Sequence, residues 1–181
     1  MDNELLKVLE AREHRWNTRK ELAKSLHRSI ITITLCVPLA FRTDKEYEEV
    51  FLYLCRSFFD DLVCSGHIAN YEGTLEGADG PVFIISVDYD AELMKRVCVE
   101  AEETIPGGRL LDIDVMDENG TPISRNDIGI PPRKCFLCDN SASSCVSRRL
   151  HSPEEVADWV KHMKKQLHSE IKPAEKPGKS G

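Results

Sequence analysis

The spacing of apolar residues predicts helices and strands in alternation. Residues 3–27 favour a helix, and residues 29–37, rich in Ile and Thr, favour a strand. A second helix is predicted up to Gly66, because Thr43 and Glu46 form a capping box and apolar residues then recur at helical spacing. The first helix carries a rough apolar stripe of Leu5, Leu9, Trp16, Leu22, Ala23 and Leu26.

The second half of the chain repeats this alternation. Strands are predicted over 67–75, 82–87, 109–116 and 121–124, with a helix after the cap Asp90. From residue 29 onward the order is therefore strand, helix, strand, strand, helix, strand. This order is typical of an α+β fold of the split βαβ, ferredoxin-like kind, an antiparallel sheet with two helices on one face.

The ends of the chain add to this predicted sheet. The first helix lies before it, and a last helix is predicted from Ser152, where a capping residue precedes a proline and a glutamate follows three positions on. No regular element is predicted between 133 and 151. We expect one domain over 1–172 and a disordered tail over 173–181.

Composition narrows the class of protein. No run of about 18 apolar residues and no secretory signal is found, so we expect a cytoplasmic protein without a membrane partner. The seven cysteines are an odd number, and in that compartment we expect reduced thiols. Four of them lie in apolar stretches and are expected to act as small hydrophobic residues: Cys36, Cys55, Cys64 and Cys98.

Charge excludes one class of partner and points to another. The net charge of −7 argues against nucleic-acid binding, which needs clustered basic residues. Residues 122–151 run against this balance, with five Lys or Arg residues and two Asp residues. Arg12, Arg15 and Arg19 lie three and four residues apart, so they share a helix face. A small phosphate-bearing ligand suits the basic segment; the alternative is a solvated basic surface.

Two carboxylates stand next to one another on the strand predicted over 109–116. Strand alternation puts Asp112 and Asp114 on the face opposite Leu111 and Ile113. Close like charges attract a hard cation such as Mg²⁺, which can neutralise a phosphate. The alternative is a polar sheet face that meets water.

Residues beside this pair strengthen the interpretation as a site. Gly108, with the glycine before it, lets backbone approach a ligand, and Arg109 supplies a planar fork suited to phosphate oxygens. A third ligand stays open among Glu102, Asp117 and Asp127.

A second group of candidate ligands follows the carboxylates. Cys135, Cys138, Cys145 and His151 form a C-x₂-C-x₆-C-x₅-H pattern, and four thiolate or imidazole ligands are what structural Zn²⁺ prefers. The open alternatives are a reduced cluster without metal and a redox or nucleophilic cysteine.

These motifs together resemble those of the citrate lyase holo-acyl-carrier-protein synthases, the CitX-type transferases. The resemblance rests on GRLLDIDV at 108–115, ISRND at 123–127 and PPRKCFLC at 131–138, with Ser141, Ala142 and His151. The opening Ala11-Arg12-Glu13 with Arg15 is also similar to that family. One departure is Ile105-Pro106, where the family usually has a histidine before the proline, so no histidine role is carried to that position.

The resemblance implies a transferase. Its donor would be 2'-(5''-triphosphoribosyl)-3'-dephospho-coenzyme A, and its acceptor a serine of the apo acyl carrier protein subunit of citrate lyase, with diphosphate released. Asp112 and Asp114 would be catalytic and hold Mg²⁺. The expected substrate-binding residues are Gly108, Arg109, Arg125, Arg12, Arg15 and Arg133.

Two other interpretations stay open. One is a related transferase that acts on another carrier, such as that of malonate decarboxylase. The other is a zinc-bearing module that binds a lyase subunit without catalysis.

Overall fold

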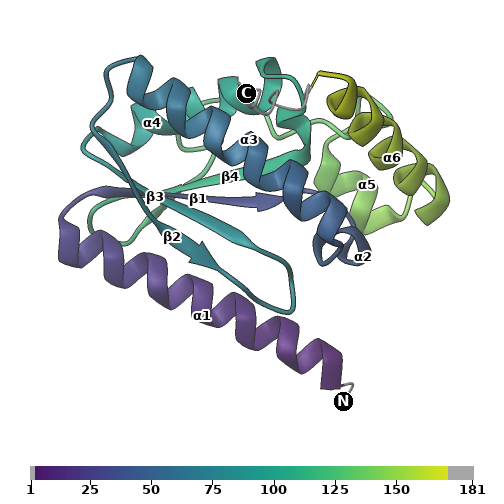
Figure 1. The fold of residues 1–181 in the computed structure, drawn as a ribbon, viewed down its shortest axis with the longest axis horizontal. Helices are drawn as coiled ribbons and strands as arrows, with labels where there is room; N and C mark the ends of the chain where they lie inside the picture. Colours follow the sequence, from purple (N-terminus) through teal and green to yellow (C-terminus); the bar gives the residue numbers. More distant parts are fainter. Residues whose placement is uncertain (1–2, 171–181) are drawn as a thin grey trace, which may run out of the picture.

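The computed structural model describes residues 3–170, and the tail predicted over 173–181 lies outside them (Figure 1). The helices are α1 (Asn3–Leu26), α2 (Leu39–Arg42), α3 (Lys45–Cys64), α4 (Ala91–Thr104), the short 3₁₀ helix η1 (Gly108–Leu110), α5 (Ala142–Arg148) and α6 (Pro153–Glu170). The strands are β1 (Ser29–Leu35), β2 (Ala69–Leu75), β3 (Val82–Val87), β4 (Leu111–Met116) and β5 (Pro122–Ile123). No helix within the described range is long and apolar enough to cross a membrane.

The strands form one antiparallel sheet in the order β2-β3-β1-β4-β5. Helix α3 connects β1 to β2, and α4 connects β3 to β4. The prediction of an α+β fold with the split βαβ order is therefore confirmed, with β5 added at one edge.

The two faces of the sheet are covered differently. Helices α3 and α4 lie on one face and α1 lies on the other (Figure 1). The main core fills the first face, because alternate strand residues such as Ile33 and Ile113 point toward Phe51, Phe58 and Met94. The α1 face has a much smaller core of Ala23, Ile30, Val82, Ile84 and Met116.

Helix α1 turns only part of its apolar stripe toward the sheet. Ala23 is fully buried and Leu22 packs beside it, while Leu5 and Leu9 are about half exposed. The helix instead turns arginines toward the sheet: Arg19 reaches Thr32 of β1. The α1 face of the sheet thus combines a small apolar core with polar contacts of this kind.

Local signals at helix ends were mostly predicted correctly. Asp90 caps α4 by accepting from the Leu93 N–H, and Ser152 and Glu155 form the reciprocal capping box of α6. The predicted Thr43 box is wrong by one residue, because the side chain of Asp44 accepts from the Glu46 N–H. The seven-residue helix α5 was not predicted.

A glycine pair makes the turn that leads into β4. Gly107 has a φ of 78°, which favours glycine, and Gly108 is buried against the end of α4. A Cβ at Gly108 would lie 2.4 Å from the carbonyl oxygen of Ala101. Packing alone accounts for this glycine, so its contact with a substrate stays a prediction.

We expect Gly108→Ala to lower the free energy of unfolding by about 2 kcal/mol, because the added methyl group has to displace backbone. Gly66→Ala is the control. Gly66 has a φ of 86°, and a Cβ added there would meet no atom within 4 Å beyond its chain neighbours, so only backbone strain of about 1 kcal/mol is expected. Urea unfolding of the two variants measures both values. Wild-type stability of Gly108→Ala would contradict this account of the turn.

Candidate functional site

Asp112 and Asp114 project together from β4, as the alternation predicts. Both side chains are more than half exposed, whereas Leu111, Ile113 and Val115 between and beside them are buried. They lie on the α1 face of the sheet, next to Thr34 and Thr32 of β1. Partial removal from water raises the pKa of Asp112, and the neighbouring charge of Asp114 raises that pKa further.

Both carboxylates line one hollow of about 440 Å³ at the β4 edge of the sheet. The loop between 122 and 133 forms its other wall. The charged groups around the hollow are Lys95, Glu102, Asp112, Asp114, Arg125 and Arg133. The structure therefore brings both predicted carboxylates together with two of the predicted arginines.

Each carboxylate has a guanidinium group beside it. Arg133 Nη1 lies 3.6 Å from Asp112 Oδ1, and Arg19 Nη1 lies 3.4 Å from Asp114 Oδ2. The Nε–H groups of Arg19 and Arg133 are buried and have no hydrogen-bond partner among the described residues. A buried donor without a partner is costly, so these two groups favour a bound anion or ordered water in the site. Arg19 had been grouped with its helix neighbours but not assigned to the site.

Arg12 and Arg15 lie further along the same face of α1. Both pair with Asp79 on the turn between β2 and β3, at 3.8 and 2.7 Å, and the side chain of Asp79 is almost fully buried. Arg12 remains 55% exposed. Neither arginine lines the hollow, and their contact with a substrate stays a prediction.

Arg125 is held by two carboxylates of α4. Its Nη2 lies 2.5 Å from the buried Glu102 and its Nη1 lies 2.9 Å from the exposed Glu103. Glu102 also accepts from the Ile113 N–H at 2.8 Å, and Lys95 donates to the Ile113 carbonyl at 2.7 Å. The edge of β4 is thus paired with side chains, and both Glu102 oxygens are occupied by partners of the chain.

The other two candidates for a third cation ligand are also engaged. Asp117 accepts from the N–H groups of Asn119 and Thr121 in the β4–β5 turn. Asp127 accepts from the hydroxyl and N–H of Ser124, which lowers its pKa.

Arg109 points away from the carboxylate hollow. Its Nη2 donates to the carbonyls of Lys134 and Cys135 at 2.8 and 3.0 Å, and its guanidinium lies over the ring of Phe136. In the opposite direction, Arg133 of the loop donates to the carbonyls of Leu111 and Arg109, both at 2.7 Å. These contacts attach residues 133–141, called here the cysteine loop, to the start of β4, and phosphate binding by Arg109 stays a prediction.

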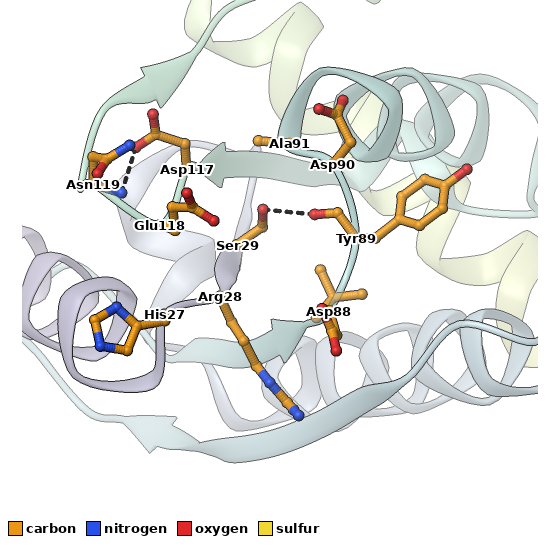
Figure 2. A pocket seen from close by; sticks show the side chains of 11 residues that line it. His27, Arg28, Ser29, Asp88, Tyr89, Asp90, Ala91, Asp117, Glu118 and Asn119 are labelled. Carbon is orange, nitrogen blue, oxygen red and sulfur yellow. Dashed lines mark hydrogen bonds between the residues drawn. The ribbon is translucent and has the colours of Figure 1, made fainter.

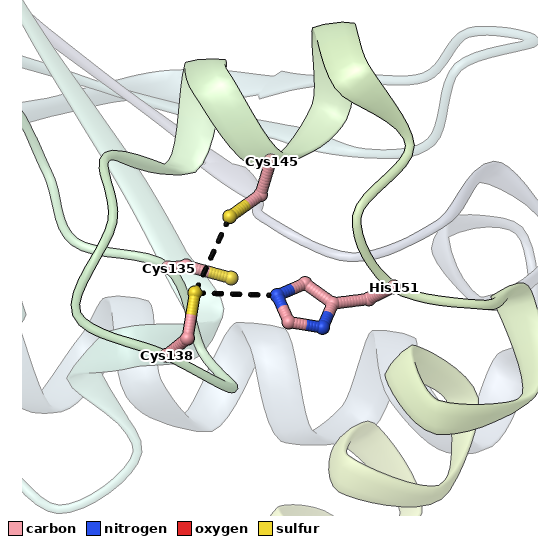
Figure 3. A group of neighbouring side chains, drawn as sticks. All are labelled: Cys135, Cys138, Cys145 and His151. Carbon is pink, nitrogen blue, oxygen red and sulfur yellow. Dashed lines mark hydrogen bonds between the residues drawn. The ribbon is translucent and has the colours of Figure 1, made fainter.

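The predicted ligand set Cys135, Cys138, Cys145 and His151 gathers in space, as Figure 3 shows. The four ligand atoms lie within 4.8 Å of one another, with Cys138 Sγ 3.4 Å from Cys145 Sγ and 3.3 Å from His151 Nε2. Tetrahedral zinc with bonds of about 2.3 Å places its sulfur ligands about 3.8 Å apart. The group can therefore hold a metal ion such as zinc. Helix α5, which carries Cys145, completes it.

The thiols of this group differ in acidity. The backbone N–H of Asn140, followed by His151 and Cys145, lowers the pKa of Cys138 to about 6. Burial, followed by the neighbouring thiols, raises the pKa of Cys145 to about 12. All seven cysteines are free, and of the four expected in apolar surroundings Cys55 and Cys98 are buried, Cys36 is half-buried and Cys64 is exposed.

A further hollow of about 410 Å³ lies at the other end of the sheet, where β1 begins (Figure 2). Its lining includes four carboxylates, of Asp88, Asp90, Asp117 and Glu118. Two of these already serve as local caps. So acidic a lining disfavours phosphate groups. Of the residues predicted for the site, Asp117 lines this hollow, as a candidate third cation ligand.

Comparison with known proteins gives a consistent result. Residues 3–167 match the CitX family, described as apo-citrate lyase phosphoribosyl-dephospho-CoA transferase. "Protein CitXG" of Leuconostoc mesenteroides subsp. cremoris is 31% identical over 170 residues, which cover 91% of this chain and 35% of that protein. The chain thus spans about a third of that relative.

Two shorter relatives are covered over most of their length. A probable apo-citrate lyase phosphoribosyl-dephospho-CoA transferase of Streptococcus pyogenes is 30% identical over 92% of this chain and 86% of that protein. An apo-citrate lyase phosphoribosyl-dephospho-CoA transferase of Escherichia coli O1:K1 is 27% identical over 88% of this chain and 82% of its own length.

Glu102→Gln is expected to lower the free energy of unfolding by about 3 kcal/mol, because it leaves the Arg125 charge without its buried partner. Glu103→Gln is a matched control on the same arginine; Glu103 is 52% exposed, so a loss of about 0.5 kcal/mol is expected. Denaturant titration of both variants measures the difference. Equal losses would show that the buried carboxylate has no special role at the β4 edge.

Proposed function

Because the chain belongs to the CitX family of apo-citrate lyase phosphoribosyl-dephospho-CoA transferases, we propose that it attaches the prosthetic group of citrate lyase. The donor is 2'-(5''-triphosphoribosyl)-3'-dephospho-coenzyme A, and the acceptor is a serine of the apo acyl carrier subunit. The observation that supports this most is the hollow in which Asp112 and Asp114 each face a guanidinium group, of Arg133 and Arg19.

The proposed reaction is a substitution at phosphorus. The serine oxygen attacks the α-phosphorus of the triphosphate, a phosphodiester bond forms, and the bond to the outer two phosphates breaks to release diphosphate. Arg19 and Arg133 hold the phosphate oxygens, using the Nε–H donors that the chain itself leaves unpaired. The arginines of α1, Arg12 and Arg15, attract the donor to this face.

A carboxylate of the pair accepts the serine proton in this scheme. Asp112 is the base in this proposal, since it lines the hollow beside Arg133, one of the arginines that hold the phosphate oxygens. Asp114 lies next to it and keeps the phosphates aligned through Arg19.

The pair also fits Mg²⁺, which proteins hold through one or two carboxylates together with substrate phosphates. Asp112 and Asp114 are exposed on the same face of one strand, two residues apart. When bound there, Mg²⁺ supplies charge neutralisation of the triphosphate and of the diphosphate that leaves.

The Cys135, Cys138, Cys145 and His151 group holds a structural Zn²⁺ in this proposal. With four protein ligands the site is closed, as structural zinc sites are. Its role is to keep the loop that carries Arg133 folded against β4, since that loop has little regular structure of its own.

Asp112→Asn is expected to reduce transfer at least about a hundredfold, because it removes both the base and a ligand of the cation. The measurement is the mass of the apo carrier after incubation with the triphosphoribosyl donor and Mg²⁺. Asp158→Asn is the control, since Asp158 is 79% exposed on α6 and lines neither the carboxylate hollow nor the Cys3His group. Leaving Mg²⁺ out of the assay should stop transfer by the wild type, and adding it back should restore transfer.

Several results of this assay would contradict the proposal. Transfer at the normal rate by Asp112→Asn would exclude the carboxylate pair as the reacting site. A mass shift of the malonate decarboxylase carrier, with none of the citrate lyase carrier, would move the activity to a different acceptor.

Elemental analysis is expected to find one zinc per chain in the purified wild type. Cys138→Ser and His151→Ala should lose the metal and unfold at a lower temperature, because the site then has three ligands. Cys64→Ser, at an exposed cysteine outside the group, should keep both metal and stability. A metal-free wild type that unfolds at the same temperature with and without added zinc would refute the zinc site.

A further inference from the structure

A third hollow, of about 510 Å³, lies beside the Cys3His group, and its lining differs from those of the other two. Its walls are mainly apolar side chains from the end of β1, the cysteine loop, α5 and α6. Its apolar lining residues include Val37, Pro38, Phe136, Val146 and Val156. Such a lining suits a flexible apolar or amide-containing chain.

This hollow adjoins the carboxylate hollow. Arg133 lines both of them. Cys36 lines the apolar hollow, and its N–H donates to the Leu110 carbonyl at 2.7 Å, so the pairing of β1 with β4 extends one residue past the strands. By strand alternation Cys36 shares the sheet face of Thr34, the register partner of Asp112. A ligand on that face can therefore reach from the carboxylates past Arg133 into the apolar hollow.

The apolar walls are accompanied by positive charge. Arg42 and Arg149 line the hollow together with Arg133, and no carboxylate is among its lining residues. Arg42 is anchored through Nε to the Val37 carbonyl at 2.8 Å. A fitting ligand thus carries an anion beside its apolar chain.

We propose that this hollow binds the dephospho-coenzyme A half of the donor, with the pantetheine chain against Val146 and Val156 and the 5'-diphosphate at Arg42 and Arg149. The inference rests on the proposed function. The donor has a triphosphate at one end and a diphosphate joined to pantetheine at the other, which matches two hollows that share Arg133 in their lining. Binding of the far half places the triphosphate over Asp112 and Asp114, and selects the full prosthetic group against ordinary nucleotides.

The test compares dephospho-coenzyme A with ADP, which has the same adenosine and diphosphate but no pantetheine chain. By calorimetry, the wild type should bind dephospho-coenzyme A at least about tenfold more tightly than ADP. Val156→Trp and Val146→Trp fill the hollow and should remove this preference while leaving ADP affinity within about twofold. Val63→Trp is the matched control, because the Val63 side chain is about half exposed on α3 and lies outside this hollow.

Each other outcome overturns the inference. Equal affinity of the wild type for the two compounds, or an unchanged preference in both hollow variants, would show that the chain binds elsewhere. A rise in KM for the carrier protein alone would assign the hollow to the acceptor. Transfer by the wild type tests the proposed function separately. An active enzyme that lacks the preference for dephospho-coenzyme A would contradict only this inference. A protein that shows the preference but transfers nothing would contradict only the proposed function.

Discussion

The buried carboxylate of Glu102 is the contact on which the site depends. It accepts from the Ile113 N–H and pairs with Arg125, and Arg133 lies 3.7 Å away. One side chain of α4 thus fixes the strand that carries Asp112 and Asp114, and links it to two arginines of the opposite wall. A charge so deeply buried is stable only because every oxygen has a partner, so the edge of β4 and the 122–133 loop are held as one unit.

The cysteine loop is attached to the same strand by reciprocal contacts. Arg109 donates to the loop backbone, and Arg133 donates from the loop to the carbonyls of Leu111 and Arg109. The stacked rings of Phe136 and Trp159 then join the loop to α6. Arg133 therefore lies on a segment with little regular structure. Contacts with β4 and with α6 nevertheless hold that segment in place, and they keep Arg133 next to the carboxylates.

Short-range patterns predicted much of this arrangement. The alternation around Asp112 and Asp114, the spacing of the four Cys and His ligands, and the strand and helix order depend on neighbours in the sequence, and the structure agrees with each. The contact of Arg19 with Asp114 could not be predicted, because it joins residues 95 positions apart through the packing of α1 on the sheet. The apolar stripe of α1 meets the sheet at Leu22 and Ala23 while Leu5 and Leu9 stay about half exposed, which the residue pattern of the helix alone does not indicate.

The backbone groups on the outer edge of β4 are bonded mainly by side chains. Strand β5 pairs only with Val115 and Met116, and the rest of that edge is bonded by Glu102, Lys95 and Arg133. An unpaired strand edge normally invites another chain to add a strand, which leads to aggregation. Here charged side chains form hydrogen bonds with those backbone groups. The protein can therefore keep the hollow open at this edge of β4 and still resist self-association there.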